Sequence, residues 1–213
     1  MNEAQVLPLF STPIYITNAS GYVNDVIDFK KINFDEFYRS HDGKILVSND
    51  QNILFDSRFT KIRQYCDQAT EDFVYEVLKT PKELKLNMTC SWMMVGYPGS
   101  ITQKHVHQNS VFSGIFYIQS GNTSGDLLLS QTPSIPTAFP STLSPIPTEI
   151  NILNSKTWAY KPQTNDIILF PSHTLHEVTP NQSKTFRCCI AFNYFLSGPI
   201  SNERTECLNI SLS

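Results

Sequence analysis

The spacing of apolar residues predicts a helix in the N-terminal third of the chain. Between residues 57 and 79 the apolar positions recur every three or four residues, which is the period of one helix face. Asp56 or Ser57 can cap its first turn, and Pro81 forbids its continuation. These apolar positions are Ile62, Tyr65, Cys66, Ala69, Phe73, Val74, Val77 and Leu78.

Weaker patterns precede this helix. Apolar residues mixed with charges over residues 22–39 predict a weak helix or two short turns. Residues 7–16 predict a short strand that Pro13 interrupts. We therefore expect a helical N-terminal part over about residues 20–80.

After Pro81 the period changes to two, which is typical of strands with one core face. In the first such stretch the positions expected to share the core face are Leu86, Met88, Cys90, Trp92 and Met94. Turn residues then separate seven further predicted strands, namely Gln103–Gln108, Gly114–Gln119, Asp126–Ser130, Thr157–Lys161, Asp166–Phe170, Glu177–Thr179 and Arg187–Phe195. Many short strands with Gly, Pro and Asn turns predict a sandwich, jelly roll or barrel.

One stretch interrupts the succession of strands. Residues 131–149 contain five prolines and a single charged residue. The segment fits a solvated connector, and it also fits a lid or a substrate-gripping loop, because long loops in compact domains are often functional.

Composition narrows the class of protein. The 213 residues favour one domain, and a net charge of −3 without a basic stripe argues against nucleic acid as the main partner. The five cysteines are irregularly spaced and form no CxxC motif, which indicates reduced thiols in a cytoplasmic protein. The N-terminus does not resemble a secretory signal, and no apolar run is long enough for a membrane helix.

Histidine carries the first chemical signal. Four of the five histidines fall into the clusters His105-Val106-His107 and His173-Thr174-Leu175-His176. Residues i and i+2 of a strand share a face, so His105 and His107 can reach one metal ion together with His176 from another strand. An isolated His-x-His also fits a surface pair, and His173 is expected at the surface or behind the ligands.

An arginine and a tyrosine carry the second signal. Arg187 lies within the apolar stretch KTFRCCIAFNYF, where a buried guanidinium needs an anionic partner such as a bound carboxylate. It also fits a sheet edge that faces water. Tyr117 can offer its hydroxyl to the same anion or serve as a core aromatic residue. Asn193 shares strand parity with Arg187, which makes it a candidate substrate contact.

The order of these motifs resembles that of the Fe(II)/2-oxoglutarate-dependent dioxygenases, in the branch similar to prolyl-4-hydroxylase. The resemblance is carried by Tyr97-Pro98-Gly99, His105-Val106-His107, Ser113-Gly114-Ile115-Phe116-Tyr117, Asp166-Ile167-Ile168-Leu169-Phe170, His176-Glu177-Val178 and Arg187. It covers roughly residues 86–195, and the His-x-His followed by Ser-Gly is most similar to a 2OG-Fe(II) oxygenase subgroup of bacteria and phages.

The resemblance implies a mainly β fold, a double-stranded β-helix (jelly roll) over about residues 84–196, with N-terminal helices packed on its outside. It implies an oxidoreductase that uses Fe(II), 2-oxoglutarate and O₂ to hydroxylate a C–H bond. His105 and His176 would be metal ligands. Arg187 and Tyr117 would bind the far carboxylate of 2-oxoglutarate.

The sequence departs from this family at one ligand. The usual His-x-Asp or His-x-Glu is here His-x-His, so His107 takes the position of the acid. We expect His107 to be the third ligand. It could instead lie behind a water molecule, or be the first ligand with Asn109 nearby. A set of three histidines also fits catalytic zinc.

Three functions therefore stay open. The leading one is a dioxygenase of the hydroxylase type acting on a small molecule or on a peptide or protein side chain. A zinc enzyme of hydrolytic type and a non-enzymatic jelly-roll module for binding or structure are the alternatives. The substrate, the native metal and the oligomeric state cannot be read from the sequence.

Overall fold

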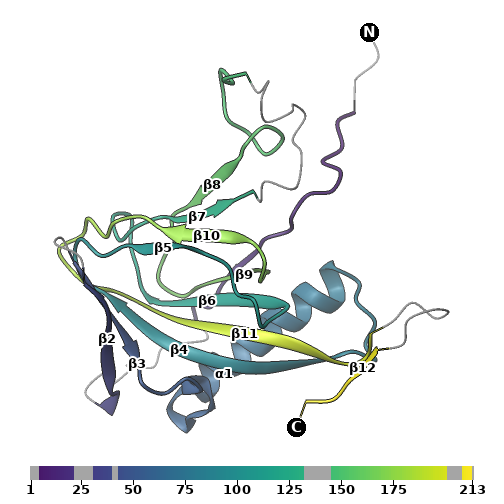
Figure 1. The fold of residues 1–213 in the computed structure, drawn as a ribbon, viewed down its shortest axis with the longest axis horizontal. Coiled ribbons are helices and arrows are strands. Elements are labelled where there is room, and N and C mark those ends of the chain that lie inside the picture. Colours follow the sequence, from purple (N-terminus) through teal and green to yellow (C-terminus); the bar gives the residue numbers. More distant parts are fainter. Residues whose placement is uncertain (1–4, 22–30, 40–42, 132–144, 201–207, 213) are drawn as a thin grey trace.

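The computed structural model describes residues 5–21, 31–39, 43–131, 145–200 and 208–212. Two β-sheets lie face to face, and helices cover the outer face of the larger one (Figure 1). The strand ladders of both sheets are antiparallel. The predicted mainly β double-stranded β-helix is confirmed.

The larger sheet runs in the order β1-β9-β6-β11-β4-β3-β2, with β12 paired to β11. Its long central strands, β4 and β11, alternate side chains between the two faces of the sheet. In chain order its strands are β1 (Tyr15–Asn18), β2 (Phe34–Arg39), β3 (Lys44–Ser48), β4 (Lys85–Gly96), β6 (Phe112–Gln119), β9 (Asp166–Pro171), β11 (Arg187–Ile200) and β12 (Leu208–Ile210).

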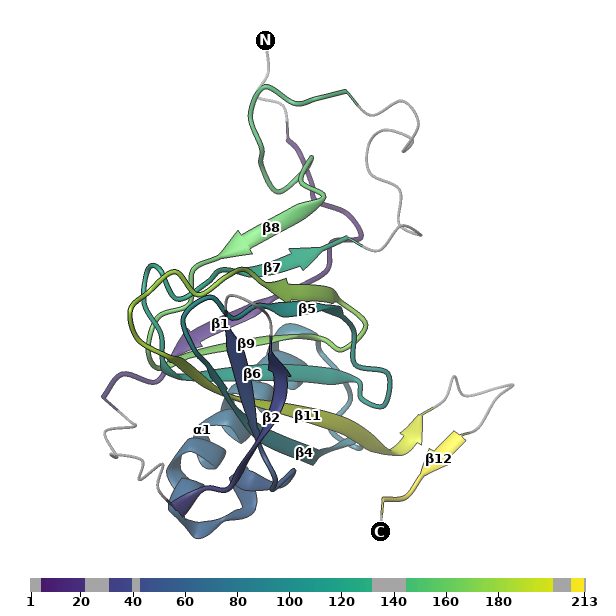
Figure 2. The ribbon, with the colours of Figure 1, turned by 60° about the vertical axis from the view of Figure 1, so that its left-hand side comes forward.

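The smaller sheet runs in the order β5-β10-β7-β8. Its strands are β5 (Thr102–His105), β7 (Leu127–Ser130), β8 (Thr157–Tyr160) and β10 (Leu175–Val178). The β7–β8 hairpin projects beyond the body of the molecule (Figures 1 and 2). The Pro-rich segment 131–149 joins these two strands, and most of it, 132–144, lies outside the described residues.

The outer core lies between the larger sheet and the helices. The helical region contains short turns η2 (Ile53–Phe55) and η3 (Ser57–Phe59), then α1 (Thr60–Glu71) and the wider turn η4 (Asp72–Val77). Asp56 caps the start of η3 by accepting a hydrogen bond from the backbone N–H of Arg58 at 2.9 Å. The side chains buried there include Ile62, Phe73, Met93, Ile190 and Phe192.

The inner core fills the space between the two sheets. It consists of Tyr117, Leu127, Leu129, Ile168, Phe170, Val178 and Cys189. Because β11 alternates, its even-numbered residues Cys188 to Tyr194 face the helices, and Cys189 faces the smaller sheet. The interior between the sheets is therefore where odd-numbered residues of β11 can meet the histidines.

The predicted single core face of β4 is wrong. Against β11, Asn193 pairs with Cys90 and Tyr194 pairs with Met88, so Thr89 is an extra residue in the ladder. This bulge exchanges the two faces of the strand. Met88 and Met93 both pack in the outer core, whereas Met94 packs against the inner core.

The helical prediction for the N-terminal part holds only in its second half. The helix over residues 57–79 is confirmed as η3, α1 and η4. The weak helix over residues 22–39 is wrong where it is described, because Phe34–Arg39 forms a strand paired with Lys44–Ser48. Residues 22–30 lie outside the described residues. The boundaries of a single domain over 1–213 stay a prediction.

The predicted strand at 7–16 begins only at Tyr15, after Pro13. Among the described residues, no helix has the length and apolar character needed to span a membrane.

Candidate metal centre

Three histidines converge between the sheets at the end of β5. His105 lies directly opposite His176 in the β5–β10 ladder. The backbone N–H of His107 donates to the carbonyl of Ser172 at 2.9 Å, which folds the chain after β5 back toward β10. The ring centroids of His105 and His176 are 4.2 Å apart, and that of His107 lies 5.3 and 5.2 Å from them. One ring nitrogen of each residue lies within 4.8 Å of the other two.

The hydrogen bonds of these rings fix which nitrogen is free. Nδ1 of His105 lies 2.7 Å from the carbonyl oxygen of Gln103, and Nδ1 of His176 lies 2.8 Å from that of Thr174. A carbonyl can only accept, so in the neutral form of each ring Nδ1 carries the proton and Nε2 keeps a lone pair. Nε2 of His105 and Nε2 of His107 lie 3.3 Å apart.

Burial keeps two of the rings neutral. It lowers the pKa of His176 to about 4, with the neighbouring His105 and His107 acting in the same direction and the hydrogen bond to Thr174 opposing them. Burial also lowers the pKa of His107, although its hydrogen bond to Asn193 opposes the shift. Neutral imidazole is the form that binds metal ions.

No carboxylate completes this cluster among the described residues. Glu177 follows His176 but forms an ion pair with Lys104 at 3.0 Å. Asp166 accepts hydrogen bonds from Asn18 and Tyr160, as expected for a residue that holds a turn. His173, which was expected at the surface or behind the ligands, is exposed.

Arg187 is buried, with 5% of its surface exposed. Nη1 donates to the carbonyl of Ser124 at 2.8 Å, and within the described parts of the chain the guanidinium has no ion-pair partner. A Cβ atom added at Gly96 would lie 3.2 Å from Nη2, and one added at Gly125 would lie 2.7 Å from Nη1. Two glycines therefore leave the space in which this charged group sits.

Ser100 lies beside the same guanidinium. Its hydroxyl is buried without a hydrogen-bond partner among the described residues, and it lies 2.7 Å from the position of a Cβ at Gly96. An unpartnered buried hydroxyl is costly unless something else binds it. The Tyr97-Pro98-Gly99 motif directly precedes Ser100, but no pattern in the sequence marked the serine itself.

Tyr117 occupies the inner core with 1% of its surface exposed. It pairs with Cys189 on β11, two residues from Arg187. Burial raises the pKa of Tyr117, and the nearby Arg187 opposes the rise. Its hydroxyl has no hydrogen bond to any part of the chain that the structure describes. Tyr117 and Arg187 therefore both have hydrogen-bond donors in this region that no protein group in those described parts accepts.

Residues 90–193 match the protein family described as "Putative 2OG-Fe(II) oxygenase". This span contains all three clustered histidines, Tyr117 and Arg187. The chain belongs to the 2OG-Fe(II) oxygenase family.

Solved structures show the same fold in this oxygenase and in distant proteins. A 2OG-Fe(II) oxygenase family oxidoreductase from Burkholderia pseudomallei superposes with a TM-score of 0.53 at 12% identity, over 78% of this chain and 73% of that chain. The epimerase SnoN from nogalamycin biosynthesis, in complex with Fe³⁺, alpha ketoglutarate and nogalamycin RO, gives 0.54 at 9% identity, over 78% and 69%. HygX from Streptomyces hygroscopicus, with nickel and 2-oxoglutarate bound, gives 0.50 at 11% identity, over 78% and 74%. No curated protein matches the sequence.

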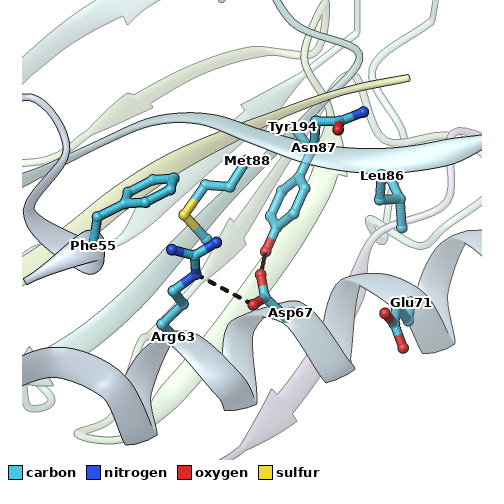
Figure 3. Close-up of a pocket in the computed structure, with 8 residues that line it drawn as sticks. All are labelled: Phe55, Arg63, Asp67, Glu71, Leu86, Asn87, Met88 and Tyr194. Atoms are coloured by element: carbon cyan, nitrogen blue, oxygen red, sulfur yellow. Dashed lines mark hydrogen bonds and ion pairs between the residues drawn. The ribbon is translucent and has the colours of Figure 1, made fainter. Parts of the chain in front are cut away.

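A cavity of about 350 Å³ lies on the other side of the larger sheet of the oxygenase, between α1 and β4. Figure 3 shows Asp67 of α1 pointing at the hydroxyl of Tyr194, which donates a hydrogen bond to it. Arg63 stands over the ring of Phe55 at 3.9 Å and reaches Asp67 at 3.4 Å. These contacts attach the helix to the sheet, and the clustered histidines do not line this cavity.

Proposed function

We propose that this oxygenase binds Fe(II) through His105, His107 and His176 and binds 2-oxoglutarate through Arg187 and Tyr117, and that it hydroxylates a C–H bond of its substrate. The observation that carries the proposal is the convergence of three imidazole nitrogens within 4.8 Å of one another in a family member.

The donor set fits a divalent cation. Nε2 of His105 and Nε2 of His107 face each other at 3.3 Å. The hydrogen bond of His105 leaves a lone pair on Nε2 of the neutral ring, and either a cation or a proton on Nε2 of His107 can satisfy it. Imidazole is a common ligand of iron, and second partners on Nδ1 are typical of metal-binding histidines.

The surroundings of Arg187 fit a carboxylate. A buried guanidinium without an ion pair is costly, and a carboxylate would accept both its charge and its hydrogen bonds. The unpartnered hydroxyls of Ser100 and Tyr117 are two further donors in the same region. The high pKa of Tyr117 keeps its hydroxyl protonated, so that it can donate a hydrogen bond to a carboxylate instead of repelling it as a phenolate would.

When bound, iron and 2-oxoglutarate supply the oxidising chemistry: one O₂ is consumed, 2-oxoglutarate becomes succinate and CO₂, and a C–H bond becomes C–OH. The residues of the chain would hold and orient these two groups. The three histidines would hold the cation, and Arg187 would hold the distal carboxylate of 2-oxoglutarate. The apolar inner core around Phe170, whose ring centroid lies 4.8 Å from that of His176, excludes water from that side.

The substrate that we propose is a small molecule or a peptide side chain. The net charge of −3 gives no support to a phosphate backbone as substrate. One distant structural relative, SnoN, is an epimerase, so the fold leaves the final outcome of the oxidation to residues outside the metal site.

Anaerobic thermal unfolding tests the proposal. Fe(II) with 2-oxoglutarate should raise the melting temperature of the wild-type protein, and Arg187→Ala should remove the contribution of 2-oxoglutarate but leave that of the metal. Arg63→Gln, a change in the cavity between α1 and β4 on the other side of the larger sheet, is the matched control and should keep both contributions. The proposal would be contradicted if 2-oxoglutarate left the melting temperature of the wild-type protein with Fe(II) unchanged and if, among metal ions, only zinc raised it.

A further inference from the structure

His107 and Asn193 meet although 86 positions of sequence separate them. Nδ1 of His107 lies 2.7 Å from Oδ1 of Asn193. His105 and His176 instead use the carbonyl of the residue two positions earlier in their own strand region. His107 is therefore the one histidine of the cluster whose Nδ1 depends on a side chain from another strand.

A chain of serine hydroxyls determines the direction of this hydrogen bond. Ser110 donates to Ser172 at 2.8 Å, Ser172 and Ser113 are 2.8 Å apart, and Ser113 donates to Oδ1 of Asn193 at 2.7 Å. Each hydroxyl has a single proton, so a Ser113 that donates to Oδ1 of Asn193 cannot also donate to Nδ1 of His107, which lies 2.9 Å from its Oγ. Oδ1 of Asn193 is then an acceptor, and the proton in its bond with His107 belongs to Nδ1.

The position of Asn193 is fixed by the strand that carries it. Nδ2 of Asn193 lies 3.4 Å from Sγ of Cys90, its partner across the ladder. The extra residue Thr89 of the β4 bulge lies just beyond this pair, and its hydroxyl donates to the carbonyl of Asn193 at 3.3 Å. A bulge commonly re-aims a side chain beside a functional site.

We propose that Asn193 is a positioning residue, whose side-chain oxygen holds His107 in the Nδ1–H form and thereby presents Nε2 to the metal ion. The part that concerns the metal rests on the proposed function. The sequence offered Asn193 as a substrate contact, but its oxygen and its nitrogen both have partners within the protein. A neutral amide also leaves His107 a neutral ligand, so that the site gains no negative charge from its third member.

The first experiment needs no metal ion. In metal-free wild-type protein labelled with ¹⁵N-histidine, long-range ¹⁵N–¹H spectra distinguish the two neutral forms of each ring. We expect His107, identified by the loss of its signals in His107→Gln, to carry its proton on Nδ1. A proton on Nε2 would mean that Nδ1 accepts a hydrogen bond, from Ser113 or from a reversed amide of Asn193, and would overturn the proposal.

The second experiment measures the affinity for Co(II) by its visible absorption. Loss of such a partner typically weakens metal binding about 10–100-fold, which we expect for Asn193→Ala. Asn193→Asp restores an acceptor and should recover most of the affinity. Asn87→Ala, on the adjacent strand β4, is the matched control and should bind as the wild type does. Equal losses in Asn193→Ala and Asn193→Asp would overturn the positioning role.

The two proposals fail separately. If the wild-type protein binds Co(II) and 2-oxoglutarate but the Asn193 variants show no rescue pattern, only the positioning role is lost. If the wild-type protein binds no metal, the proposed function fails, and the tautomer of His107 is still decided by the first experiment.

Discussion

Gly125 leaves the space that the guanidinium of Arg187 occupies: a Cβ at Gly125 would lie 2.7 Å from Nη1 of Arg187. It would also lie 2.4 Å from the carbonyl oxygen of Thr179, and the φ angle of Gly125 is +98°. Residues with a side chain rarely adopt such a φ. The backbone carbonyl of Thr179 also cannot move aside as the end of a flexible side chain can.

Gly125→Ala should therefore destabilise the protein by at least about 1–2 kcal/mol and weaken binding of 2-oxoglutarate by displacing Arg187. Urea unfolding and calorimetry of 2-oxoglutarate with the metal-loaded protein measure the two effects. Gly121→Ala is the matched control, because the nearest atom to its added Cβ is 4.0 Å away. Normal stability and normal affinity in Gly125→Ala would contradict this role of Gly125.

His176→Ala should abolish tight binding of a divalent metal, because it removes the buried ligand of the cluster. His173→Ala changes an exposed histidine three positions earlier and should leave binding intact. Trp92 offers a direct readout, since its ring centroid lies 5.8 Å from that of His107.

In a Trp158→Phe background Trp92 is the only tryptophan, and bound Co(II) should quench its fluorescence. Equal quenching in the His176 and His173 variants would show that the metal binds elsewhere.

Tyr117→Phe separates ligand binding from folding. The hydroxyl has no protein partner among the described residues, so its removal should cost the metal-free protein little stability. A hydrogen bond to a charged group contributes about 1.5–3 kcal/mol, so the affinity for 2-oxoglutarate should fall by about 10–100-fold. Calorimetric titration measures this loss, and an unchanged affinity would remove Tyr117 from the site.

Phe73 tests the attachment of the helical layer. Its side chain is fully buried in the outer core, with ring centroids 5.8 Å from Phe112 and 5.7 Å from Tyr15. Phe73→Ala should destabilise the protein by about 3–5 kcal/mol. Phe37→Ala, at a side chain that is 72% exposed, should change the urea midpoint little. Similar midpoints for the two variants would contradict the assigned core.

The elements that could be predicted from the sequence are those that burial organises. The helix over residues 57–79 and the strands β4, β6, β9 and β11 bury much of their surface, so their apolar positions appear in the pattern. β2 was missed because its described side chains are largely exposed at the sheet edge, where pairing with β3 rather than burial stabilises it.

The contacts of the site were only partly predictable. Strand parity placed Asn193 on the inner side, because alternation is local. His105 and His107 meet for another reason, since β5 ends at His105 and the hydrogen bond from the His107 N–H to Ser172 folds the following chain back. The bulge at Thr89 depends on the partner strand, and so does the pairing of Asn193 with His107. Ser100 is significant only through its place beside Gly96 and Arg187, which no local pattern records.

The central claim is that three imidazoles hold one metal ion beside a guanidinium that binds a diacid. The most direct measurement is an anaerobic crystal structure of the protein with Mn(II) and 2-oxoglutarate, with anomalous scattering to locate the metal. The account predicts one anomalous peak bound by Nε2 of His105, His107 and His176, and a carboxylate of 2-oxoglutarate against Arg187. A metal bound away from these nitrogens, or 2-oxoglutarate bound without contact to Arg187, would contradict it.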